Sequence, residues 1–146
     1  MNEAAPEGPD SAHVRPPGVG DATVKALGML SKALETTERA RGALYDFHQL
    51  TGTADLQLGE AVALLREAGH SRQADLVERE ILGRNTIPGH WTYQIIEEYN
   101  ATYYRPFAEV EADVRAELGA GRDHLYEAEL KQRRRTRGHS DHTWSE

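Results

Sequence analysis

Four polar side chains are of types that could bind a metal ion inside a helical bundle. The candidates are His48, Glu60, Glu80 and Glu98. Ferritin-like di-iron proteins use Glu on two helices and Glu-x-x-His on the other two. This chain has a single Glu-x-x-His, Glu67–His70, and Gly69 places that histidine at a helix end rather than inside. The pattern supplies only half of the required ligands, so no cofactor is predicted and a metal ion is kept as an alternative.

A second group of side chains could line a pocket for a small ligand. The run Trp91–Phe107 holds most of the aromatic residues, and apolar walls with a few polar groups are typical of ligand pockets. The alternative is that these tyrosines pack in the core with their hydroxyls reaching solvent, while Arg41 and Glu98 form one buried ion pair. The pocket candidates are Arg41, His48, Glu98, Tyr99 and Tyr103.

The segment Lys131–Arg137 is basic. From Lys131 to the end, five positive and two negative charges give +3, so the rest of the chain carries −7 − (+3) = −10. A basic run can neutralise phosphates, but Glu127 and Glu129 stand four residues before Lys131 and Arg133, a spacing suited to ion pairs within a helix. With an acidic body and no helix-turn-helix pattern, the chain is not expected to bind nucleic acid.

Sequence motifs for catalysis are missing. There is no Gly-x-Ser-x-Gly elbow, phosphate loop or dinucleotide fingerprint in the chain. Glu97 and Glu98 are adjacent on an expected helix, so their side chains point about 100° apart and are not a matched acid and base. The sequence favours a non-enzymatic protein and leaves enzymatic activity open.

Composition limits the fold further. The chain has 146 residues, a net charge of −7 and no cysteine, which excludes disulfides, thiolate metal sites and a cysteine nucleophile. It has no apolar run near the roughly 18 residues of a membrane span, and residues 1–20 lack the apolar core of a signal peptide. We therefore expect a cytoplasmic protein without membrane contact. Residues 1–20, rich in Pro and Gly, are expected to be a disordered leader.

From Asp21 onward, apolar residues recur at helical spacing and predict an all-α fold. We predict an antiparallel four-helix-type bundle over residues 21–121, with two long and two short helices. The first long helix is expected to end at Gly52, and the second, starting near Trp91, to be kinked by Pro106. A basic C-terminal helix at 122–137 and a flexible tail at 138–146 complete the prediction.

The expected helix lengths suggest self-association. One stripe of the first helix includes Ala26, Leu27, Ala33, Ala40 and Phe47. Two short helices would cover only half of the two long ones, and bare apolar stripes are costly in water. A second copy related by two-fold symmetry would cover them; the alternative is that the C-terminal helix does so. The predicted homodimer interface is Leu27, Leu30, Leu34, Val110, Val114 and Leu118.

Several short segments resemble small all-helical proteins of high-GC bacteria that have no assigned function. The resemblance rests on Tyr45–Gly52, Leu65–His70, Gly83–Asn85, His90–Tyr93, Glu97–Tyr99 and His124–Leu130. It covers about four-fifths of the chain, in keeping with a single-domain size, and implies no mechanism. The sequence therefore predicts a helical protein that acts by self-association and by binding another protein, with a bundle that binds a metal ion or a small ligand as the alternative.

Overall fold

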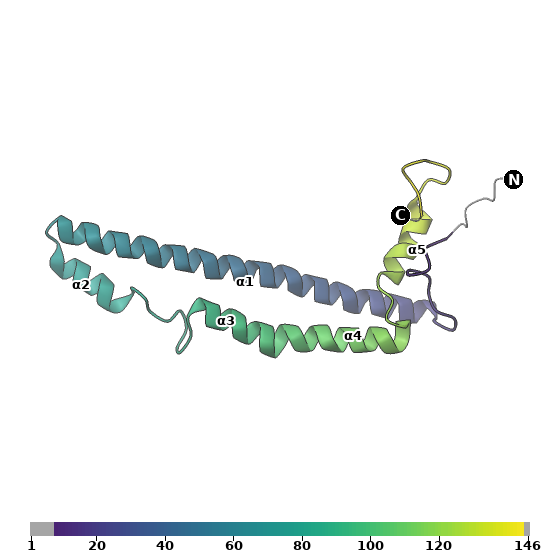
Figure 1. Ribbon diagram of the computed structural model, residues 1–146, viewed down its shortest axis with the longest axis horizontal. Coiled ribbons are helices and arrows are strands. Elements are labelled where there is room, and N and C mark those ends of the chain that lie inside the picture. Colours follow the sequence, from purple (N-terminus) through teal and green to yellow (C-terminus); the bar gives the residue numbers. More distant parts are fainter. Residues whose placement is uncertain (1–7, 145–146) are drawn as a thin grey trace. The chain divides into compact units, whose positions relative to one another are not determined.

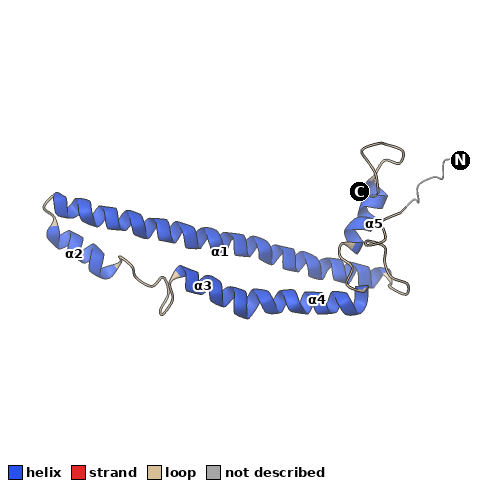
Figure 2. Ribbon diagram, viewed as in Figure 1, coloured by secondary structure: helices blue, strands red, loops and turns tan. Residues whose placement is uncertain are grey.

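A computed structural model describes residues 8–144, and within that range the chain is helical with no β-strand (Figure 2). This confirms the predicted all-α class. The chain divides into two compact units. We call Met1–Thr36 with Pro106–Glu146 the terminal unit and Thr37–Arg105 the central unit. None of the helices in the described range is long and apolar enough to cross a membrane.

Helix α1 (Asp21–Glu67) is a single helix of 47 residues that contributes to both units (Figure 1). The predicted break at Gly52 is wrong. A glycine terminates a helix when it adopts the left-handed conformation, and Gly52 has no positive φ, whereas Gly69, just after α1, has φ +85°. The residues around Gly52 are good helix formers, so one glycine costs some stability without ending the helix.

In the central unit, the C-terminal part of α1 is accompanied by α2 (Ser71–Glu80), α3 (Thr92–Tyr99) and the π-helical segment η1 (Asn100–Tyr104). Val62 of α1, Ala74 of α2 and Ile96 of α3 are its buried apolar side chains among the described residues. At the α1–α2 corner, Arg66 forms ion pairs with Asp75, at 2.6 Å, and with Glu78. The apolar core of this unit is small.

The helix that leads towards Pro106 is interrupted one turn before the proline. Pro106 has no N–H, and its ring would clash with the carbonyl of Thr102 in a regular α-helix. The chain forms the wider turn of a π-helix at Asn100–Tyr104 instead, which is a known way to relieve such conflicts. The sequence predicted a kink at Pro106, but it did not predict the π-helical turn that precedes the proline.

In the terminal unit, the start of α1 packs against α4 (Arg105–Gly119) and α5 (Leu125–Arg134). Gly119 allows close packing, since a Cβ there would lie 3.0 Å from Leu27 Cδ1. The carboxylate of Glu111 is buried and is bonded by Ser31 of α1, at 3.0 Å, and by Arg115, at 3.0 Å. The apolar core of the terminal unit consists of the buried side chains of Val24, Leu27 and Leu125.

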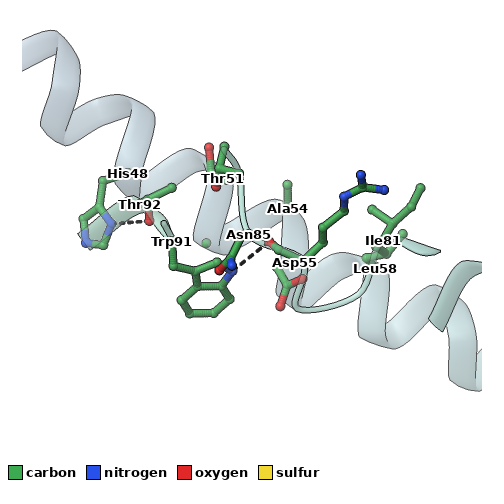
Figure 3. A pocket seen from close by; sticks show the side chains of 12 residues that line it. His48, Thr51, Ala54, Asp55, Leu58, Ile81, Asn85, Trp91 and Thr92 are labelled. Carbon is green, nitrogen blue, oxygen red and sulfur yellow. Dashed lines mark hydrogen bonds between the residues drawn. The ribbon is translucent and has the colours of Figure 1, made fainter. Parts of the chain in front are cut away.

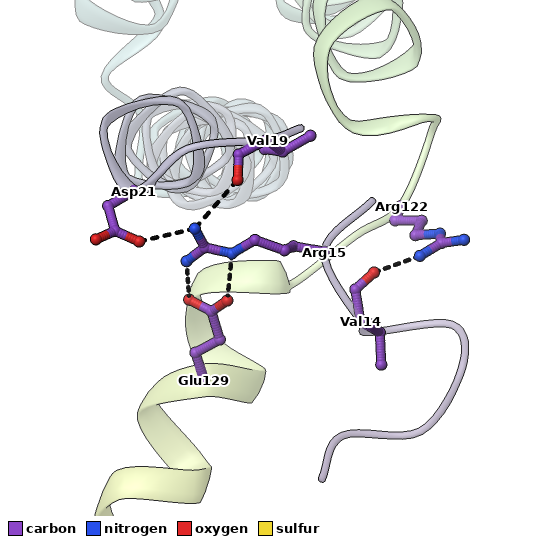
Figure 4. A network of polar contacts seen from close by, with 6 residues as sticks. All are labelled: Val14, Arg15, Val19, Asp21, Arg122 and Glu129. Carbon is purple, nitrogen blue, oxygen red and sulfur yellow. Dashed lines mark hydrogen bonds and ion pairs between the residues drawn. The ribbon is translucent and has the colours of Figure 1, made fainter. Parts of the chain in front are cut away.

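The structure gives residues 8–20 of the predicted disordered leader specific contacts, while residues 1–7 lie outside the described range. Figure 4 shows Arg15 forming a bidentate pair with Glu129 of α5, at 2.8 and 2.9 Å, and a third contact with Asp21. Arg122 donates to the carbonyl of Val14. Composition could not reveal the contacts with Glu129 and Arg122 because these join residues more than 100 positions apart.

The predicted flexible tail also carries structure as far as it is described, to residue 144. The imidazole of His142 accepts the Thr136 N–H at 3.1 Å, and its ring lies 4.4 Å from that of His139. The terminal unit thus includes the leader, α5 and these turn residues, which were predicted as three separate segments.

Replacing Gly52 with Ala tests the continuity of α1. In a helix interior, with nothing within 4 Å of the new Cβ, the substitution should raise the free energy of unfolding by about 0.5–1 kcal/mol. The matched control, Gly69→Ala, should lower it by a similar amount because φ there is +85°. Urea denaturation followed by circular dichroism measures both. If Gly52→Ala instead lowers the free energy of unfolding, the result would support the predicted end of the helix at Gly52.

Candidate functional site

The central unit contains a pocket of about 480 Å³ between α1 and the loop 81–91 (Figure 3). This volume is in the range of small-ligand sites. Apolar walls come from Ala54 and Leu58 of α1 and from Ile81 and Trp91 of the loop. The other lining residues are His48, Thr51, Gly52, Asp55, Arg84, Asn85, Thr86 and Thr92.

Two hydrogen bonds fix the loop that forms the outer wall. The carboxylate of Asp55 on α1 accepts the Gly83 N–H at 2.7 Å, where Gly83 has φ +68°. The indole Nε1–H of Trp91 donates to the carbonyl of Arg84 at 3.0 Å, which closes the loop on itself. Because the ring of Trp91 is held at its polar edge, its apolar faces are left for packing, and the pocket is preformed.

His48 and Thr92 form the polar end of the pocket. His48 Nδ1 lies 2.6 Å from Thr92 Oγ1, and Thr92 is buried as the first residue of α3. Helix α3 begins there because Gln94 Oε1 accepts the Trp91 N–H at 2.8 Å, which satisfies a free amide at the helix start. The contact with Thr92 fixes the orientation of the His48 ring, and Thr92 is itself held in place as the first residue of α3.

Of the five predicted pocket residues, the structure places only His48 in this pocket. Arg41 is held elsewhere: Nε donates to Asn100 Oδ1 at 3.1 Å, and Nη1 to Glu38 at 2.9 Å. The guanidinium lies 3.7 Å from the centre of the Tyr104 ring. The Tyr104 hydroxyl also donates to Glu38, and this bond, followed by the Arg41 contact, lowers the pKa of the Glu38 carboxyl.

The proposed buried pair of Arg41 and Glu98 does not form. Glu98 is exposed on α3, and its carboxylate lies 2.8 Å from His90 Nε2. Tyr99 and Tyr103 stack on each other at 5.4 Å between ring centres, with Tyr103 about half exposed. The prediction failed because a level match between helices does not state which face of each helix a side chain occupies.

The four predicted metal ligands are not brought together. His48 contacts Thr92, Glu98 contacts His90, and Glu80 pairs with the neighbouring Arg79. Within residues 8–144 no group of three or more His, Asp or Glu side chains could hold a metal ion. Every buried side-chain nitrogen or oxygen in that range has a hydrogen-bond partner. The donor set therefore does not fit a di-metal centre.

The charged residues of α5 contact other partners than the predicted ones. Glu129 binds Arg15 rather than Arg133, and Glu127 lies 3.9 Å from His124. Arg135 instead donates to Gln132 at 2.7 Å. The intrahelical ion pairs expected from the spacing of four residues are replaced by one long-range pair that attaches residues 8–20 to α5.

A second candidate site is an exposed face of α1. Its residues follow a spacing of three and four, and every one is exposed. This outer stripe, as we call it, is Ala26, Met29, Ala33, Thr36, Ala40, Ala43, Phe47, Leu50, Ala54, Gln57, Ala61 and Leu64. Leu50 is 68% exposed, Leu64 63% and Met29 62%. Such a repeat over many turns is the pattern of a helix that packs on another helix.

The residues predicted to form the homodimer interface do not share one exposed face. Leu27 is buried within the terminal unit, so it is not available to a partner. Val110 and Leu118 of α4 are exposed, and the remaining members, Leu30, Leu34 and Val114, are half-buried. The single stripe assumed for the first helix is in fact two stripes, because Ala26 and Leu27, or Ala33 and Leu34, point about 100° apart.

Comparison of the chain with protein-family models, with curated proteins and with solved structures gave no match. The resemblance to small helical proteins of high-GC bacteria thus stays a prediction. The pocket was missed at the sequence level because its wall is an irregular loop. One signal was present: Trp91 stands two residues after Gly89 of the Pro88-Gly89 turn, so a large aromatic side chain lies at the end of this loop.

The His90–Glu98 contact beside the pocket predicts a titration. The hydrogen bond with Glu98, followed by that with the Pro88 carbonyl, raises the pKa of His90 above its ordinary 6.5. The contact therefore stabilises the fold fully below pH 6.5 and is lost as the pH rises through the higher folded-state pKa. NMR titration should show this raised pKa, and Glu98→Gln should lower it. Glu97→Gln is the control, and an equal effect of both variants would contradict the assignment.

Proposed function

We propose that this protein acts by association rather than by catalysis. Two copies pair through the outer stripe of α1, and the resulting dimer binds another protein. The observation that carries the proposal is the exposure of a continuous apolar heptad stripe on a helix that is already packed along a different face. In a monomer the large side chains of this stripe stay in water, whereas burial of one large aliphatic side chain contributes about 1.5–3 kcal/mol.

The composition of the stripe supports a helical partner. Its only polar members are Thr36 and Gln57, and the Thr36 hydroxyl is already bonded to the carbonyl of Lys32 at 2.9 Å. Small residues, mostly alanine, recur along it and allow two helices to approach closely, towards the lower end of the usual range of about 8–10 Å. The exposed Val110 and Leu118 of α4 extend the apolar surface available to a protein partner.

A second candidate function is binding of a small apolar ligand in the pocket of the central unit. The observation in its favour is a preformed cavity of about 480 Å³ with Trp91, Leu58 and Ile81 in its wall. Such a cavity suits an aromatic or aliphatic compound that also carries one hydrogen-bonding group. This function is compatible with self-association.

Leu50→Glu tests pairing through the outer stripe. The wild type should have twice the chain mass of 16.3 kDa in size-exclusion chromatography with light scattering. Because each dimer loses two buried leucines and gains two charges, the variant should raise the dissociation constant at least about a hundredfold. The helix content of the monomer should not change, since Leu50 lies outside both cores.

The matched control is Leu56→Glu on the same helix. Leu56 is 74% exposed, even more than Leu50, but it is not a member of the outer stripe. It should leave the dissociation constant unchanged. A wild type that stays at 16.3 kDa at all concentrations, or equal effects of the two variants, would contradict the proposal.

Thr51→Phe tests the pocket, because a phenyl ring at position 51 fills it. In a Trp144→Phe background, Trp91 is the sole tryptophan, and its fluorescence should change on titration with the apolar probe 8-anilinonaphthalene-1-sulfonate. Thr51→Phe should weaken this binding at least about tenfold. The control, Thr53→Phe, lies outside the pocket lining and should bind as the wild type does. Equal binding by both variants would exclude the pocket.

A further inference from the structure

The charges beside the outer stripe indicate how two copies pair. We infer that α1 pairs with α1 of a second copy in the antiparallel direction, with the two-fold axis close to Tyr45. This inference rests on the proposed self-association and adds its geometry. It is carried by one row of side chains at steps of seven along α1, beside the outer stripe.

This row, which we call the flanking row, is strictly ordered by charge. Its members at steps of seven are Lys25, Lys32, Arg39, Asp46, Thr53, Glu60 and Glu67, and all are exposed. The N-terminal part is entirely basic, and the C-terminal part contains all the acidic members. Residues at steps of seven lie on one line of a helix that packs as a coiled coil. The row therefore has a positive half and a negative half.

None of the charged members of the flanking row forms an ion pair within 4.0 Å among residues 8–144. Other charged residues of the chain do find partners: Arg66 binds Asp75 and Glu78, and Arg115 binds Glu111. The chain thus pairs charges at its internal helix contacts and leaves the flanking row available. Charged rows that border an apolar stripe decide partner choice and orientation in coiled coils.

Direction follows from which rows meet. In an antiparallel pair, the row beside the stripe faces the same row of the second copy, in the reverse order. Lys25 then lies nearest Glu67 of the second copy and Lys32 nearest Glu60. Near the axis, Arg39 lies nearest Thr53 of the second copy, and the two copies of Asp46 form the one like-charge contact of the row. In a parallel pair the flanking row faces instead the half-buried row that contains Leu44, Leu58 and Leu65, which carries no charge. Opposite charges thus meet towards the two ends of the antiparallel pair, whereas the parallel direction offers the charges of the flanking row no charged partner.

The apolar side chains fit the same register. With the axis near Tyr45, Leu50 lies opposite Ala40 of the second copy, and Phe47 opposite Ala43. At the ends, Leu64 lies opposite Ala26 and Met29 opposite Ala61. Each large side chain meets a small one, so the layers fill without strain, as close packing requires. A parallel pair would place Phe47 against Phe47 and alanine against alanine.

Two charge-reversed variants test this arrangement. Lys25→Glu with Lys32→Glu makes the charged part of the flanking row almost wholly acidic, and Glu60→Lys with Glu67→Lys makes it almost wholly basic. Each variant alone should dimerise at least about tenfold more weakly than the wild type, because like charges then face each other. An equimolar mixture should form a heterodimer at least as tight as the wild type. Native mass spectrometry with light scattering measures all of these species.

Controls carry the same change of net charge elsewhere. Arg133→Glu with Arg134→Glu, and Glu97→Lys with Asp141→Lys, alter exposed side chains outside α1 and should leave dimerisation unchanged. Circular dichroism confirms that each variant folds. A wild type that is monomeric overturns the proposed function together with this inference. A wild-type dimer whose reversed variants pair normally, or fail to recover on mixing, overturns the antiparallel arrangement alone.

Cysteine cross-linking gives an independent reading, because the chain has no cysteine of its own. Leu64→Cys mixed with Ala26→Cys should form a heterodisulfide on oxidation, since these positions are opposite each other in the antiparallel pair. Leu64→Cys alone should stay reduced, because its two copies are then about 57 Å apart along the axis. A disulfide between two Leu64→Cys chains would show a parallel pair and overturn the inference.

Discussion

The architecture depends on one constraint: a helix of 47 residues must be packed along its sides, because most helical stability in proteins comes from tertiary packing of an amphipathic face. Helix α1 obtains this support from α4 and α5 in the terminal unit and from α2 and α3 in the central unit. Among the described residues, the alanine, leucine and methionine side chains of the outer stripe stay exposed. The outer stripe therefore lies outside the packing that supports α1 within one chain.

Specific polar contacts support the small apolar cores of both units. In the terminal unit, the Arg15–Glu129 pair ties residues 8–20 to α5, and the buried Glu111 carboxylate is shared by Ser31 and Arg115. These partners make burial of the Glu111 carboxylate tolerable, and loss of one partner would leave a costly unpaired charge. In the central unit, Asp55 performs a similar task by holding Gly83 and with it the loop that walls the pocket.

How far the sequence determines these features depends on the range of the interaction. Helical periodicity, the left-handed Gly69 and the disturbance near Pro106 are local, and they were predictable. Gly52 was misread because a helical glycine and a terminating glycine differ only in φ, which tertiary packing decides. The order of residues 8–20 depends on Glu129, far away in sequence, and no local pattern reveals it. The two stripes of α1 were merged because neighbouring residues such as Ala33 and Leu34 both fit a loose helical spacing.

The two proposed activities meet at one residue. Ala54 belongs to the outer stripe of α1 and also lines the pocket, so a second copy that packs on the stripe would lie at the pocket wall. A ligand that fills the pocket and a second copy of the chain would then contact the same stretch of α1. By thermodynamic linkage, whatever the ligand does to the dimerisation constant, dimerisation must do to ligand affinity by the same factor. Pairing and ligand binding would thus be coupled through the wall that they share, without any change in the rest of the fold.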